Sequence, residues 1–111
     1  MDFSLEEIDT GVIVINFTGR LDAQGAETLN ARLSELLENN GHLIIANLAG
    51  VSQLPSPGIR FLLKFALYIK ERGGKLVIAA PQPQVEYALC VAGVDTEIKI
   101  FASVKRARGE I

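Results

Sequence analysis

The stretch Leu54-Pro55-Ser56-Pro57-Gly58-Ile59 opens a long apolar segment, and the rest of the chain is organised around it. Pro57 disfavours the α region for the residue before it, so Ser56 is expected to have extended dihedral angles. Such angles suit a helix N-cap, whose hydroxyl accepts a hydrogen bond from the N–H of Gly58 or Ile59. Pro57 then lies at the first helical position, where its missing N–H costs nothing. We expect a helix over 57–72, with Ser56 either as a simple cap or as a place where a phosphate is stabilised.

On both sides of this stretch, the sequence alternates between strand-like and helix-like segments. An apolar pair of segments around the turn at Gly11 predicts an antiparallel hairpin, and alternating helices and strands after it predict parallel strands. The expected strands cover 3–8, 12–17, 42–48, 75–80 and 97–101; the expected helices cover 23–39, 57–72, 83–92 and a short stretch within 102–108. This order predicts one α/β domain over residues 1–111, with a mixed sheet of four to five strands. Functional loops in such sheets follow the C-terminal ends of parallel strands, as the loop before Ser56 does.

Composition narrows the function classes. The 111 residues carry a formal charge of −2, which gives no basic surface for nucleic acid. Cys90 is the only cysteine, so the chain cannot form an internal disulfide. No apolar run approaches the ~18 residues of a membrane span, and the N-terminus lacks a signal-peptide pattern. We expect a cytoplasmic protein without membrane insertion.

Residues that could support catalysis are few. His42 is the only histidine, and no partner for it as a base or ligand can be argued. One histidine and one cysteine are too few for a zinc site, and no glycine-rich phosphate loop or nucleophile elbow occurs. We therefore expect no enzyme activity, no metal and no cofactor.

The helix expected over 57–72 has two apolar faces. Helical spacing places its core stripe at Ile59, Leu62, Leu63, Ala66 and Ile69. A second flank, Phe61, Phe65 and Tyr68, either packs against a neighbouring helix or forms a partly exposed binding surface beside Ser56. In the second case Arg60 and Lys64 would form its polar rim.

Several motifs together resemble the STAS domain family, which includes bacterial anti-sigma-factor antagonists and the cytoplasmic domains of sulfate transporters. The resemblance covers nearly the whole chain and rests on the order and spacing of these motifs: Phe17-Thr18-Gly19-Arg20-Leu21-Asp22 with Ala26-Glu27-Thr28-Leu29, the Asn47-Leu48 pair that ends a strand, and Gly73-Gly74-Lys75-Leu76-Val77 followed by Pro83, Val85, Leu89 and Gly93.

The resemblance to the antagonists implies that Ser56 is a phosphoacceptor for an anti-sigma factor that is itself a serine kinase, and that a serine phosphatase removes the phosphate. Pro55 and Pro57 stand where the antagonists have aspartate and serine or threonine, so the phosphorylation motif is incomplete. The residues expected to bind the partner are Asp22, Pro55, Ser56, Pro57, Gly58, Arg60, Phe61, Lys64 and Phe65.

Three alternatives stay open from the sequence. The chain could be a phosphorylated antagonist, or a non-phosphorylated STAS adaptor of a transporter ATPase or scaffold complex, which the two prolines favour. A small-ligand or nucleotide-binding module rests on fold analogy alone. Whether the chain forms a homodimer is also left open.

Overall fold

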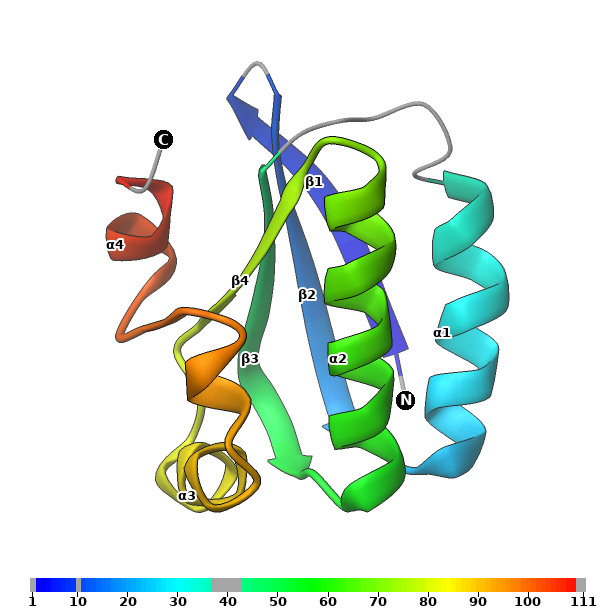
Figure 1. Cartoon of the computed structure of the whole chain (residues 1–111), viewed down its shortest axis with the longest axis vertical. Coiled ribbons are helices and arrows are strands. Elements are labelled where there is room, and N and C mark those ends of the chain that lie inside the picture. Colours follow the sequence, from blue (N-terminus) through cyan, green and yellow to red (C-terminus); the bar gives the residue numbers. More distant parts are fainter. Residues whose placement is uncertain (1, 10, 37–42, 110–111) are drawn as a thin grey trace.

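The computed structural model describes residues 2–9, 11–36 and 43–109 (Figure 1). The elements follow the order β1 (Asp2–Asp9), β2 (Val12–Arg20), α1 (Ala23–Leu36), β3 (Leu43–Gln53), α2 (Ser56–Glu71), β4 (Lys75–Ala79), α3 (Pro83–Val91), the 3₁₀ helix η1 (Val94–Thr96), β5 (Ile100–Phe101) and α4 (Val104–Arg108). The expected end of α1 near Asn39 and the strand start at His42 lie outside the described residues.

The five strands form one mixed sheet in the order β1-β2-β3-β4-β5. β1 pairs with β2 in the antiparallel direction, and every later pair is parallel. The predicted hairpin and the predicted parallel strands are therefore confirmed. β3 is longer than predicted, because two irregularities in the register let β2 stay paired with it as far as Gln53. β5 is shorter than predicted, because the N–H groups of Glu97 and Ile98 turn back to the carbonyl oxygen of Val94 and do not pair with β4.

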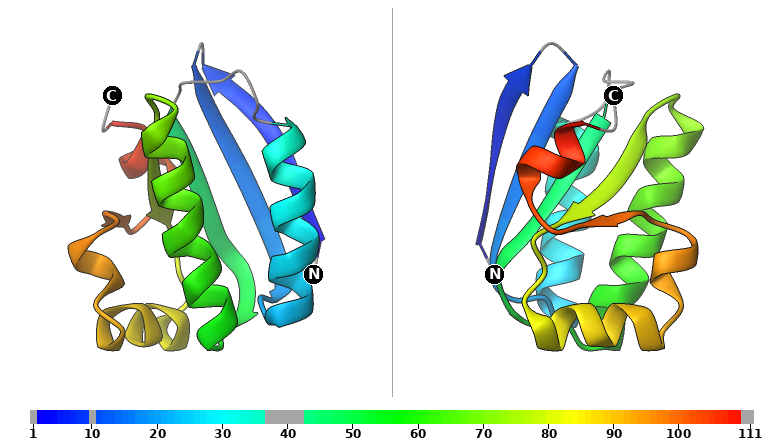
Figure 2. Two further views of the ribbon diagram at one scale, coloured as in Figure 1. Left: turned by 45° about the vertical axis from the view of Figure 1, so that its right-hand side comes forward. Right: turned by 90° about the vertical axis from the view of Figure 1, so that its left-hand side faces the viewer.

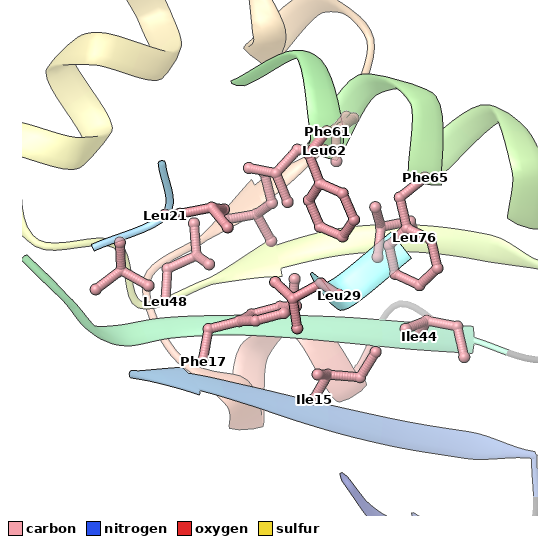
Figure 3. Close-up of a cluster of buried hydrophobic side chains, with 14 of the residues drawn as sticks. Ile15, Phe17, Leu21, Leu29, Ile44, Leu48, Phe61, Leu62, Phe65 and Leu76 are labelled. Atoms are coloured by element: carbon pink, nitrogen blue, oxygen red, sulfur yellow. The ribbon is translucent and has the colours of Figure 1, made fainter. Parts of the chain in front are cut away.

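The main core lies between the sheet and the helices α1, α2 and α3. Strand residues that point to this side alternate along the chain, as Ile13, Ile15 and Phe17 do in β2. They pack against Leu29 of α1 and Leu62 of α2 (Figure 3). The intervening strand residues face the other side of the sheet.

A smaller apolar cluster covers that second side. Val12 and Val14 of β2 belong to it, and Ala107 of the short helix α4 is fully buried there. The Arg108 guanidinium forms an ion pair with the Asp9 carboxylate, which joins α4 to the β1–β2 hairpin. Both side chains are about half exposed, so this pair contributes little to stability.

The buried face of α2 differs from the prediction. Phe61 and Phe65 are only 5% exposed, and their rings stack with centroids 5.6 Å apart, whereas Ile59, Leu63 and Ala66 are half-buried. The reason is that α2 lies beside α1 as well as against the sheet (Figure 1), so Phe61 and Phe65 join the same buried cluster as Leu29 of α1. The expectation of a partly exposed aromatic flank is wrong for these two rings; the alternative of packing against a neighbouring helix is correct.

Across the described ranges, none of the helices is both long enough and apolar enough to cross a membrane.

Candidate functional site

The start of α2 differs from the predicted cap. Pro55, with φ −70° and ψ 168°, is the N-cap residue, and its carbonyl oxygen accepts from the N–H groups of Gly58 (2.9 Å) and Ile59 (3.2 Å). These are the donors that the Ser56 hydroxyl was expected to satisfy, so among the described residues no side chain caps this helix. Ser56 is instead the first residue of the helix, and it is exposed. The prediction that Ser56 is the N-cap is wrong, because the carbonyl oxygen of Pro55 already accepts the hydrogen bonds from both of these N–H groups.

Gly58 brings the starts of α1 and α2 together. A Cβ atom on Gly58 would lie 2.2 Å from the carbonyl oxygen of Leu21 and 2.9 Å from its side chain. Only glycine allows so close an approach between the helix and the loop that precedes α1. Gly58 is itself buried, so it shapes the surface and does not form part of it.

Asp22 is the N-cap of α1. Its Oδ1 atom accepts from the N–H of Gly25 at 2.9 Å, and its carbonyl oxygen accepts from the N–H of Ala26. An aspartate in this position satisfies one unpaired donor and complements the positive end of the helix. The side chain is half-buried, so Asp22 combines a structural role with partial access to a partner.

The candidate residues that are exposed or half-buried lie at or near the starts of α1 and α2, which are close together (Figure 1). We call this surface the Ser56 face; it comprises Asp22, Pro55, Ser56, Pro57, Arg60 and Lys64. A shallow groove of about 210 Å³ runs between α1 and α2 at this face, lined on the α2 side by Pro57, Arg60, Phe61 and Lys64. Phe65 and Gly58 are buried and do not contribute to it.

The α1 side of this groove was not predicted. It is lined by Ala23, Ala26, Glu27 and Asn30, which follow Asp22 at helical spacing. Glu27 places a negative charge opposite Arg60 and Lys64, so the groove has an acidic and a basic wall. The signal that was missed is Gly58, because a buried glycine at a helix start indicates that another backbone lies against it.

The end of β3 is held in place beside this face. The side chain of Gln82 donates to the carbonyl oxygen of Ala49 at 2.8 Å, and that of Gln84 donates to the carbonyl oxygen of Ser52 at 3.3 Å. These bonds tie the start of α3 to the strand that leads into Pro55. The connection from β3 to Ser56 is therefore short and supported on one side.

Metal ligands do not cluster in the part of the chain that the structure describes: no group of three His, Cys, Asp or Glu residues comes together there. Cys90 is exposed on α3, where partial desolvation and the carboxylates of Asp95 and Glu86 raise the pKa of its thiol. A raised pKa makes a cysteine a poor nucleophile at neutral pH.

The STAS domain family matches residues 5–107, and the chain belongs to this family. The anti-sigma F factor antagonist of Lysinibacillus sphaericus is 26% identical over 95 residues, covering 85% of this chain and 81% of that protein. Both the fold and the family predicted from the sequence are confirmed.

Solved structures support the same fold. The unphosphorylated anti-sigma factor antagonist SpoIIAA superposes with a TM-score of 0.81 at 23% identity, covering 98% of this chain and 95% of that one; Bacillus SpoIIAA in its phosphorylated form gives 0.72 at 22% identity, covering 98% of each chain. A sulfate transporter family protein of Wolinella succinogenes gives 0.79 at 19% identity, with coverage of 92% and 85%. The fold is thus shared by antagonists and by transporter proteins.

Proposed function

We propose that this chain is a regulatory protein of the anti-sigma-factor-antagonist type, which binds its partner through the Ser56 face and has no catalysis of its own. The observation that carries the proposal is the exposure of Ser56 in the first turn of α2, at the C-terminal end of β3. Distant similarity to an anti-sigma F factor antagonist supports the choice of partner, an anti-sigma factor.

We further propose that phosphorylation of Ser56 switches this binding. A phosphoserine carries a charge of about −2, which is favourable at a helix N-terminus. Arg60 follows Ser56 by four residues, so on the helix surface their Cβ atoms lie about 5–6 Å apart and the guanidinium can reach the phosphate. The phosphate then neutralises the basic rim that Arg60 and Lys64 offer to an acidic partner surface. The switch is local: the buried rings of Phe61 and Phe65 do not move.

Mass spectrometry tests the phosphorylation. The full chain is incubated with ATP and the serine kinase encoded beside its gene, and the modified residue is mapped. We expect one phosphate, on Ser56, that Ser56→Ala abolishes and Ser52→Ala leaves intact; Ser52 is a matched control, since it is also exposed and lies only four residues earlier. An unmodified Ser56 would refute the phospho-switch and leave the binding surface to be tested separately.

Charge reversal tests the surface. Arg60→Glu and Ser56→Asp should each weaken binding to the anti-sigma factor by about tenfold, because they place negative charge against an acidic partner. Lys105→Glu, which reverses an exposed charge on α4, is the control and should bind normally. Equal affinity for all four proteins would show that the Ser56 face is not the interface.

A second function is favoured by the two prolines. Pro55 and Pro57 replace the residues expected around a phosphorylated serine, and the fold is shared with a sulfate transporter family protein. As an adaptor in a transporter ATPase or scaffold complex, the chain would keep its partner whatever the charge at Ser56. Co-purification with an ATPase that Ser56→Asp leaves undisturbed would select this function.

A further inference from the structure

The last residues of β3, which lead toward Ser56, are paired with a strand on one side only. Within residues 43–109, β4 pairs with β3 as far as Asn47, opposite Ala79, whereas β2 stays paired with β3 to Gln53. Carbonyl groups that point to the β4 side beyond Asn47 therefore need other donors. Helix α3 lies across this end of the molecule, where β3 ends and α2 begins (Figure 2).

Two glutamine side chains at the start of α3 supply such donors. The side-chain amide of Gln82 donates to the carbonyl oxygen of Ala49 at 2.8 Å, and that of Gln84 donates to the carbonyl oxygen of Ser52 at 3.3 Å. The same Gln84 nitrogen also donates to the Oε1 atom of Gln82 at 2.8 Å, so the two side chains are joined to each other. We call these two glutamines the amide clamp, because together they bridge Ala49 and Ser52.

The chain around the amide clamp is restricted. Gln82 stands between Pro81 and Pro83, and each proline limits its own φ and the conformation of the residue before it. Gln82 is accordingly extended, with ψ 154°, and its carbonyl oxygen accepts from the N–H of the buried Val85. Ala80, with φ +54°, turns the chain out of β4 just before this segment. Strained residues of this kind persist where the surrounding structure holds them, and they cluster at functional sites.

The amide clamp acts on the segment that leads to Ser56. Ser52, whose carbonyl oxygen it holds, lies four residues before Ser56. The next carbonyl oxygen, that of Gln53, accepts from the N–H of Leu21 at 3.2 Å. Two successive carbonyl groups are thus held by different parts of the chain, one by α3 and one by the loop before α1. Leu54 follows and is buried, so the path into α2 is fixed on both sides.

We propose that Gln82 and Gln84 are positioning residues for Ser56, because they fix the end of β3 and with it the direction in which the chain enters α2. The proposal rests on the function proposed above, since it concerns how the Ser56 face is presented to its partner. Each glutamine acts through the backbone of Ala49 or Ser52 and not by touching the partner. The partner then meets a preformed surface, and binding does not have to order this segment at a cost in affinity.

The test replaces each glutamine by methionine, which is uncharged and of similar length but has no N–H to donate. In the free chain, Gln82→Met and Gln84→Met should each speed exchange of the Leu21 amide proton by about three- to tenfold, because the segment that accepts from Leu21 has lost a hydrogen bond. Each should also weaken binding to the anti-sigma factor encoded beside the gene by about threefold. Gln53→Met is the matched control; Gln53 is exposed on the same segment, its side chain is not part of the amide clamp, and both values should stay unchanged.

The affinity separates positioning from simple stabilisation, since a substitution that only lowers stability leaves the affinity of the folded protein unchanged. The proposal is overturned if Leu21 exchanges at the wild-type rate in both clamp variants, or if Gln53→Met has the same effects. It is also overturned if both clamp variants bind normally while Arg60→Glu binds weakly. If Arg60→Glu binds normally as well, the proposed function has failed, and the exchange rate of Leu21 alone decides whether the amide clamp holds this segment.

Discussion

Gly58 of α2 lies directly against the backbone of Leu21, and a Cβ atom at Gly58 would be 2.2 Å from the Leu21 carbonyl oxygen. That atom belongs to the main chain, so no rotamer change of a side chain can make room for it. The contact sets the distance between the starts of α1 and α2, and this distance determines the shape of the groove between the two helices.

Gly58→Ala should therefore destabilise the fold by about 1–3 kcal/mol, the usual cost of overpacking a tight core. Urea denaturation followed by circular dichroism measures this change. Gly73→Ala is an informative comparison, because Gly73 has open space around it but a φ of +86°, so any loss there arises from backbone strain alone. A Gly58→Ala protein as stable as the wild type would show that α2 is not held against Leu21.

The two helix starts respond differently to loss of their polar side chains. Asp22→Ala removes a capping hydrogen bond from α1 and should cost about 1 kcal/mol. Ser56→Ala removes no capping bond and should change the free energy of unfolding by less than about 0.5 kcal/mol. Thermal unfolding of the two variants checks this; a larger effect at Ser56 than at Asp22 would restore Ser56 as the cap.

This contrast shows which parts of the structure could be predicted from the sequence. Strand and helix order follows from the hydrophobic period and the turn residues, and it was predicted correctly. The N-cap residue of α2 was not predicted correctly. Pro55 and Ser56 are adjacent, and either of them can precede a first helical turn that contains Pro57. Pro55 has a backbone carbonyl as suitable as the hydroxyl of Ser56, and local rules do not choose between them.

The site depended on tertiary contacts that the sequence does not display. Angles around a single helix placed Phe61 and Phe65 on a flank, but only the position of α1 decides whether that flank is exposed. The α1 wall of the groove, including Glu27, was missed for the same reason. The position of Arg60 and Lys64 on the exposed side of α2 was predicted correctly, because the helical period alone gives it.

Cys90 should react slowly with thiol reagents despite its exposure. Partial desolvation and the nearby carboxylates of Asp95 and Glu86 raise the pKa of its thiol, so little thiolate is present at neutral pH. The rate of alkylation should keep rising with pH beyond the range in which an unperturbed cysteine levels off. Glu86→Gln removes one of the charges and should shift the rate profile to lower pH; an unchanged profile would mean that this carboxylate does not act on the thiol.

Ala80 has a φ of +54°, and among the described residues it is the one non-glycine residue with a positive φ. This conformation costs an L-residue with a Cβ atom roughly 1 kcal/mol. It is maintained because the Ala80 N–H donates to Phe101 at 2.9 Å, which fixes the end of β4 just before Pro81. Ala80→Gly should relieve this strain, and after the entropic cost of glycine in the unfolded chain the free energy of unfolding should rise by up to about 0.5 kcal/mol.

The neighbouring residue supplies the control for this prediction. Ala79 is fully buried in β4, and Ala79→Gly removes a packed methyl group and adds unfolded-state entropy with no strain to relieve. Ala79→Gly should therefore lower the free energy of unfolding, whereas Ala80→Gly should raise it. Chemical denaturation of both variants under one set of conditions gives the comparison. If both substitutions destabilise the protein equally, the positive φ of Ala80 is not a source of strain.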